Sequence, residues 1–304
     1  MAHDSALMPS SVDVSRIVRT ADMDCDASGD MNKRASELGT GPIEWRGFGL
    51  GSDLSLKLWC DPELAQRAIA EVEQIIKTVE STFSIYNPVS DLSRLNREKS
   101  LHMSPLFARL LEYCDVAHSM TNGHFDPSVQ SVWSGGGNAT DRWSDIVRDD
   151  QKILLGPQHS LTFNGIAQGF ATDLAKSALS DLGLSRVLVN LGEFAGLGGP
   201  FTISVSDPDA GLIDIETIEN LSIATSSPWA MHVGNSGHII NPVTGAPPNF
   251  TTLSVIHDSA AIADGLSTGL VFATDQLLQL CIDAPMGPKS IIGRRTSGEI
   301  IRFG

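Results

Sequence analysis

After residue 185 the sequence consists mainly of short β-rich runs that follow one another instead of alternating with helices. Consecutive strands of this kind favour an α+β fold, whereas a doubly wound parallel sheet would place a helix between successive strands. We therefore predict a single mixed domain. The predicted strands are 54–59, 186–192, 201–206, 220–226, 238–240 and 251–257, with a terminal hairpin over 289–303.

The helices are predicted mostly in the first half of the chain. The segment 61–83 begins with Asp61 in the capping position and Pro62 in the first turn, and its apolar residues recur at helical spacing. The segment 104–123 has the same design and ends at Gly123, a residue typical of helix ends. The other predicted helices are 167–182, 262–282 and a short one capped near Ser90.

Composition limits the classes of partner. The chain has 304 residues, 41% of them hydrophobic, which is enough for a substantial core without disulfides or metals. Its formal net charge of -15 would repel nucleic acid and anionic membranes, so neither is expected as a partner. The four scattered cysteines suggest neither a disulfide framework nor a zinc site.

Residues 1–40 are predicted to be a disordered acidic leader, and residues 41–304 the folded domain. Asp22, Asp24 and Asp26 imitate the start of a calcium loop, but the later positions of that loop are not matched. The leader has no signal peptide and the chain no transmembrane segment, so we expect a cytoplasmic protein.

Two polar segments rich in small residues are candidate binding sites. In 121–138, Phe125 precedes Asp126 and offers either a stacking surface for a flat ligand or an ordinary core side chain. The glycine run later in that segment lacks a phosphate-loop spacing. In 162–179, Gly165 and Gly169 lie where a helix begins, which favours either a diphosphate at the helix N-terminus or close packing.

Two further segments carry potential chemistry. Asp264 and Thr268 are four residues apart, so on a helix they share a face and provide hard oxygen donors for magnesium. Capping and back-bonding by the same two residues is the structural alternative. In "GHIINPVTGAPP" (237–248), the Asn-Pro turn explains the bend, and His238 is either a strand residue or an acid, base or ligand.

These segments, in this order, resemble the ApbE family, flavin transferases that move FMN from FAD to a Ser or Thr of a target protein. The resemblance runs from about residue 45 to the C-terminus. The matching motifs are "LGSDLSLKLW" (50–59), "FSIYNPVSDLSRLN" (83–96), "GHFDPSV" (123–129), "NGIAQGFATD" (164–173), "VNLGEFAGLG" (189–198), "IATS" (223–226), "HIINPVTG" (238–245) and "ADGLSTGL" (263–270).

The resemblance implies an ApbE-type, T-fold-like domain with a cleft for FAD as substrate, a Mg²⁺ ion near its diphosphate, and an acceptor protein as partner. It implies that His238 is the catalytic base and that Asn164, Asp264 and Thr268 are metal ligands. The residues it implies for holding FAD are Leu50, Gly51, Ser52, Tyr86, Phe125, Asp126, Gly165, Gln168 and Glu193.

The chain departs from the family pattern at three positions of interest. Gln168 stands where the family often has Lys, Asn241 replaces Asp, and Val243 replaces a frequent Arg. Three functions therefore remain open: an FMN transferase, a hydrolase that splits FAD into FMN and AMP, and a flavin-binding protein with impaired catalysis.

Overall fold

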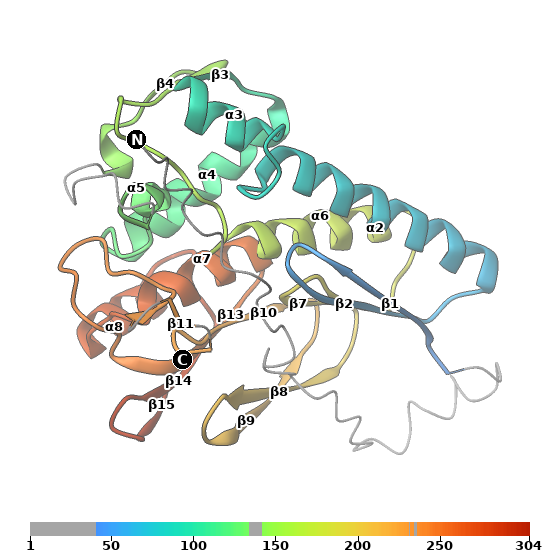
Figure 1. Cartoon of the computed structure of the whole chain (residues 1–304). Helices are drawn as coiled ribbons and strands as arrows, with labels where there is room; N and C mark the ends of the chain where they lie inside the picture. The colour runs from blue at the N-terminus through green and yellow to red at the C-terminus, as the bar shows by residue number, and fades with distance from the viewer. Residues whose placement is uncertain (1–40, 134–141, 231, 234–235) are drawn as a thin grey trace, which may run out of the picture.

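The structure is a computed structural model, and it describes residues 41–133, 142–230, 232–233 and 236–304 (Figure 1). The expected leader with its calcium-like segment, and the glycine run at 135–137, lie outside the described residues.

Eight strands within the described residues form one antiparallel sheet, in the order β1-β2-β6-β7-β10-β13-β14-β15. This confirms the α+β class. The strand bounds are Ile43–Gly49 (β1), Ser52–Leu58 (β2), Val187–Asn190 (β6), Phe194–Leu197 (β7), Ser222–Ser226 (β10), Phe250–His257 (β13), Ser290–Arg295 (β14) and Ile300–Phe303 (β15).

The helices cover one face of this sheet, and a second hairpin packs on the other (Figure 1). The alternation of strand side chains builds both layers. In β6, Val187 and Val189 enter the core beneath the helices, whereas Leu188 contributes to the core beneath the hairpin. That hairpin consists of β8 (Phe201–Asp207) and β9 (Gly211–Ile218).

The remaining elements complete the helical side. Asp61, Ser90 and Ser104 cap their helices as predicted, each accepting a backbone N–H through its side-chain oxygen. The helices are α2 (Pro62–Phe83), α3 (Asp91–Glu98), α4 (Pro105–Met120), α5 (Gln130–Trp133), α6 (Ala167–Asp181), α7 (Ala260–Leu270) and α8 (Asp275–Asp283), with 3₁₀ turns at Pro127–Val129 and Trp143–Asp145. The short strands are β3 (Ser100–His102), β4 (Val147–Arg148), β5 (Lys152–Leu154), β11 (His232–Val233) and β12 (Ser236–Gly237).

Two predicted elements were wrong. The helix expected over 262–282 is two helices, because the chain turns after Leu270 and Thr274 then caps α8. The strand expected over 238–240 is absent: β12 ends at Gly237, and the His238 N–H donates to the Pro228 carbonyl instead of joining a ladder.

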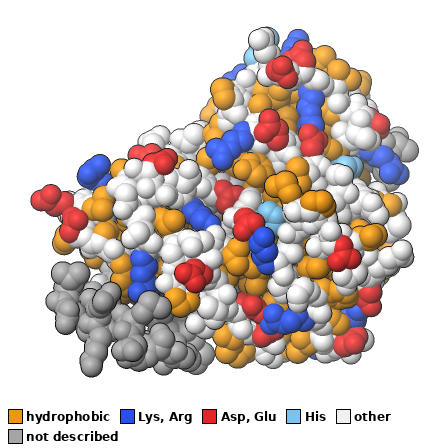
Figure 2. Space-filling view, turned by 180° about the vertical axis from the view of Figure 1, so that it is seen from behind, with side chains coloured by type: hydrophobic (Ala, Val, Ile, Leu, Met, Phe, Trp, Pro, Cys, Tyr) orange, Lys and Arg blue, Asp and Glu red, His pale blue; other side chains and the backbone are white. Residues whose placement is uncertain are grey.

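Charged side chains of both signs are interspersed with apolar ones on the face shown in Figure 2. No described helix is both long enough and apolar enough to cross a membrane.

Candidate active site at the α6–α7 contact

Helix α6 and the turn before it lie so close to α7 that an added Cβ would clash at two glycines. A Cβ on Gly169 would lie 2.3 Å from the carbonyl oxygen of Ala260, and one on Gly165 would lie 2.8 Å from Thr268 Oγ1. The sequence predicted close packing as one reason for these glycines, and the partner is a helix instead of a sheet. The contact brings the start of α6 against the residues expected to bind metal.

Asp264 lies at the centre of this contact and is 4% exposed. Its Oδ2 accepts a hydrogen bond of 3.0 Å from the Gly169 N–H. Burial raises the pKa of Asp264 to about 7, while the Gly169 hydrogen bond opposes the rise. A carboxylate in this position is therefore costly to ionise unless a cation accompanies it.

Glu193, expected to contact the cofactor, is a second buried carboxyl beside Asp264. Burial raises its pKa well above the usual value, and the charge of Asp264 raises it further. Its Oε2 accepts a 3.0 Å hydrogen bond from the Thr225 N–H, which opposes the rise and fixes the side chain to β10. Two neighbouring buried carboxyls make the site attractive to a cation.

The oxygen donors around Asp264 fit a magnesium ion. Thr268 Oγ1 lies 3.3 Å from the Gly165 carbonyl oxygen, so a hydroxyl and a carbonyl stand together one helical turn from the carboxylate. Magnesium prefers such hard oxygen ligands and retains several waters, so few protein donors are needed. Among the described residues there is no group of three or more His, Cys, Asp or Glu side chains that could hold a metal ion.

Asn164, the third expected metal ligand, is exposed, and its N–H donates to Thr162 Oγ1 at 3.3 Å. The atom of this turn that contacts Thr268 is the Gly165 carbonyl oxygen. The turn therefore lies at the expected place, but the oxygen nearest to Thr268 belongs to Gly165 and not to Asn164.

Gln168 connects the start of α6 to the β1–β2 turn. Its Nε2 donates to the Leu50 carbonyl at 3.1 Å and to Ser52 Oγ at 3.2 Å. Leu50 and Gly51 form the turn with φ of 52° and 81°, a geometry that suits a two-residue hairpin. The structure thus brings together four of the residues expected to bind FAD.

The Leu50 N–H donates to Glu80 Oε1 at 2.9 Å. This contact ties the same turn to α2. Sequence reasoning missed Glu80, because it lies on an ordinary helix face with no motif around it.

The Phe125–Asp126 loop has a different environment from the one expected of a stacking surface. Phe125 is 4% exposed and lies in the main core, as the alternative interpretation of this residue foresaw. Asp126 is also buried, and its carboxylate accepts hydrogen bonds from the Ser128 N–H, the Ser128 hydroxyl and the Trp143 N–H at 2.8, 2.6 and 3.2 Å. Tyr86, in contrast, is 78% exposed.

His238 is hydrogen-bonded to the chain just after β10, and the last residue of β10 contacts α7. Ser226, the last residue of the IATS motif and of β10, has its Oγ 2.8 Å from Ser267 Oγ and 3.4 Å from Thr268 Oγ1. Two residues later, the Pro228 carbonyl accepts a 3.1 Å hydrogen bond from the His238 N–H. The hydroxyl of Ser226 was not among the expected site residues, although its motif was recognised.

The turn after His238 has the predicted chemistry. Asn241 Oδ1 accepts the N–H groups of Val243 and Thr244, each at 3.0 Å, and Gly245 takes a φ of 68°. Burial lowers the pKa of His124, and the Asn241 side chain beside it partly offsets that effect. Asn241 therefore has a full structural role in place of the family's Asp.

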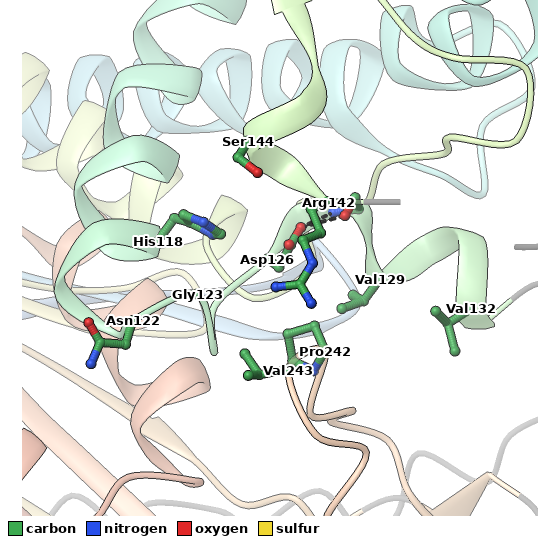
Figure 3. A pocket seen from close by; sticks show the side chains of 11 residues that line it. His118, Asn122, Gly123, Asp126, Val129, Val132, Arg142, Ser144, Pro242 and Val243 are labelled. Carbon is green, nitrogen blue, oxygen red and sulfur yellow. Dashed lines mark hydrogen bonds between the residues drawn. The ribbon is translucent and has the colours of Figure 1, made fainter. Parts of the chain in front are cut away.

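A cavity of about 140 Å³ lies between this turn and the Asp126 loop (Figure 3). His118 Nδ1 lies 2.8 Å from the Phe125 carbonyl oxygen at one wall. Arg142 and Asp126 are both among the side chains that line the cavity in Figure 3. The cavity is lined by His118, Asn122, Gly123, Asp126, Ser128, Val129, Val132, Arg142, Ser144, Pro242 and Val243. His118 and Arg142 carry no motif, so the sequence alone did not indicate them.

Comparisons with known proteins show which proteins this chain resembles. The chain is 30% identical over 251 residues to an FAD:protein FMN transferase of Chlamydia trachomatis, covering 69% of this chain and 77% of that protein. It is 24% identical over 297 residues to the enzyme of the same name from Vibrio cholerae, covering 84% of this chain and 89% of that protein.

Solved structures share the fold. The apo flavinyl transferase ApbE of Pseudomonas stutzeri superposes with a TM-score of 0.74 at 22% identity, covering 86% of this chain and 93% of that one. The ApbE protein of Thermotoga maritima gives a TM-score of 0.76 at 21% identity, covering 86% and 96%. The family model described as the ApbE family matches residues 50–285, and this chain therefore belongs to the ApbE family.

Proposed function

We propose that this chain is a magnesium-dependent FAD:protein FMN transferase, which moves FMN from FAD to a Ser or Thr hydroxyl of an acceptor protein and releases AMP. The transferase activity follows from family membership and from relatives named FAD:protein FMN transferase. The observation that supports the chemistry most directly is the oxygen cluster at the α6–α7 contact, made by the buried Asp264 and the half-buried Thr268 and Gly165.

The electrostatics of this cluster explain why an acidic protein can bind a diphosphate. The start of α6 has the partial positive charge of a helix N-terminus, and its Gly169 N–H donates to the carboxylate of Asp264. Bound magnesium would supply charge neutralisation at the diphosphate and at the transferred phosphoryl group. Asp264, Thr268 and a carbonyl of the 164–165 turn would hold it.

The remaining work is positioning and proton transfer. Gln168 fixes the Leu50–Ser52 turn beside α6, so that the turn can border the bound FAD. The acceptor hydroxyl oxygen attacks the FMN phosphorus, the bond to the AMP oxygen breaks, and the hydroxyl proton passes to the imidazole of His238. AMP leaves with the electron pair of the broken bond.

The test follows both products. The protein is incubated with FAD and Mg²⁺, with and without a candidate acceptor domain, and AMP release and covalent flavin are measured. An acceptor with its Ser or Thr changed to Ala is the matched control. Transfer predicts AMP and covalent flavin together, and only with the intact acceptor.

Other outcomes identify the alternatives. AMP release that does not depend on acceptor would indicate that water is the nucleophile and that the protein is an FAD hydrolase. Tight FAD binding without AMP release, with an acceptor that a related transferase does modify, would indicate a flavin-binding protein with impaired catalysis.

A further inference from the structure

We infer that Asp173 is a positioning residue for the metal-binding pair Asp264 and Thr268, because its carboxylate fixes the register of α7 on α6. The inference rests on the function proposed above. Asp173 lies on α6, two turns beyond the site, and it is part of no metal or FAD contact described so far.

Asp173 caps α7 from another helix. Its Oδ1 accepts the Ala260 N–H at 2.8 Å, its Oδ2 accepts the Ala261 N–H at 3.0 Å, and the Ser259 hydroxyl also donates to Oδ2. The Ser259 hydroxyl in turn accepts the next amide of α7, that of Ile262, at 3.2 Å. The first three amides of α7, which have no partner within their helix, are thus all bonded, two of them by Asp173.

This cap is the end of a regular series of contacts between antiparallel helices. Asp173 meets Ala260, Gly169 meets Asp264 and Gly165 meets Thr268, so each step of four residues back through α6 and into the turn before it matches a step of four residues forward along α7. The hydrogen bonds of Asp173 to α7 therefore follow the same alignment of the two segments as the two contacts at the proposed metal site.

The register is needed for the donor geometry. A displacement of one residue along a helix moves a side chain by about 1.5 Å and turns it by about 100°. Either change would remove Asp264 from the Gly169 N–H and Thr268 from the Gly165 carbonyl. A charged cap also suits the helix N-terminus electrostatically, which makes Asp173 a strong anchor against such a displacement.

The experiment compares Asp173→Ala and Asp173→Asn with Asp61→Ala. Asp61 caps α2 by accepting the Leu64 N–H at 2.9 Å, and α2 carries none of the proposed metal donors, so this variant loses a carboxylate helix cap away from the site. Mg²⁺ is titrated into each FAD-saturated protein, and binding is followed by thermal shift and calorimetry. Hydrogen exchange of the peptides covering Gly169 and Asp264 reports the register directly.

We expect Asp173→Ala to raise the apparent dissociation constant for Mg²⁺ by about 10-fold, the lower end of the effect of losing a hydrogen-bond partner of a metal ligand, because Asp173 acts through α7 and bonds no ligand itself. Exchange at the Gly169 amide should accelerate, and high Mg²⁺ should restore turnover. Asp173→Asn, which keeps one acceptor oxygen, should lie between this variant and the unaltered protein. If Asp173→Ala does not fold, the Mg²⁺ affinity of Asp173→Asn is compared with that of the unaltered protein instead.

Equal effects of Asp173→Ala and Asp61→Ala on Mg²⁺ binding would overturn the inference, as would unchanged Mg²⁺ binding in both Asp173 variants or the lack of any Mg²⁺ response in the unaltered protein. The Mg²⁺ titrations and the hydrogen-exchange measurement need no acceptor protein. Failure of flavin transfer in the unaltered protein, by contrast, would count against the proposed function while leaving the comparison of Mg²⁺ affinities intact.

Discussion

At the scale of single residues, Asp264 has an unfavourable environment when it is ionised. It is buried, a second buried carboxyl lies beside it, and its Oδ2 receives a single backbone N–H. Residues held in this way gain from a bound cation more than exposed carboxylates do. The site thus has a physical preference for a metal that surface acidic groups of this chain lack.

Replacing Asp264 with Asn should abolish magnesium-dependent FMN transfer and leave the fold intact. Asn can still accept the Gly169 N–H, so the helix contact is kept while the charge is lost. We expect transfer to fall by at least about 100-fold, since a metal ligand and not merely its supporting partner is removed. The measurement is covalent flavin per hour at saturating Mg²⁺.

Asp258→Asn is the matched control for this change. Asp258 precedes α7, and its exposed side chain pairs with Lys289 at 3.1 Å. It should transfer flavin at the unaltered rate. Full activity in Asp264→Asn would remove Asp264 from the metal site.

The metal-free protein should lose stability as the pH rises from about 4 to 7. The folded pKa of Asp264, about 7, lies above its usual value of 3.8, so in this range the folded state holds a proton that the unfolded state has released. The contribution is complete below the unfolded pKa and disappears as the pH passes the folded one. The slope approaches about 1.4 kcal/mol per pH unit for one proton.

Urea unfolding of the unaltered protein and of Asp264→Asn, each in the presence of a chelator, would measure this difference at several pH values. The unaltered protein should show the steeper decline. Parallel profiles for the two proteins would show that Asp264 does not titrate as described.

At the scale of elements, the site depends on how closely α6 and α7 approach. Gly169→Ala should separate the two helices, because the added methyl carbon would meet the Ala260 carbonyl oxygen at 2.3 Å and Asp264 Cβ at 2.7 Å. We expect a loss of about 1–3 kcal/mol, typical of overpacking, together with weaker Mg²⁺ binding. On an exposed helix surface the same substitution would stabilise the protein. The sign of the change in the free energy of unfolding is therefore informative by itself.

Ser177→Ala, on the exposed side of the same helix, is the comparison. It should leave the unfolding midpoint and Mg²⁺ binding nearly unchanged. A stabilising Gly169→Ala would mean that α6 and α7 can move apart without cost, and the close contact would then be unnecessary for the site.

At the scale of the whole molecule, a cluster of aromatic rings in the core includes Phe163, which directly precedes the turn at 164–165. The Phe83 ring packs against Phe107, Phe163 and Phe170 with centroid separations of 5.4, 5.7 and 5.9 Å. These rings belong to α2, α4, the loop before α6, and α6 itself. One core thus connects the turn at 164–165 to two distant helices.

Phe163→Leu and Phe107→Leu should both destabilise the protein, each by roughly 1–2 kcal/mol, since less volume is lost than in a change to Ala. Both rings are fully buried, but only Phe163 adjoins the turn that carries Asn164 and Gly165. Phe163→Leu alone should therefore weaken Mg²⁺ and FAD binding. Denaturant unfolding and ligand titrations separate the two effects, and equal ligand affinities in the two variants would contradict this link.

The features that could be predicted from the sequence are those that depend on interactions between neighbouring residues. Ser90 and Ser104 cap their helices, Asn241 and Gly245 form their turn, and β-branched runs form strands, because these preferences arise from interactions over a few residues. The ordered motifs also identified the family, because their types and order extend over most of the chain.

Which of these residues contact one another in the folded protein depends on the tertiary structure. Gly169 bonds Asp264 across 95 residues and Thr268 bonds Gly165 across 103, and no local preference encodes such pairs. Packing likewise buried Phe125. Contacts of this kind form only when the layers of the domain come together, so the chain specifies them through the core as a whole.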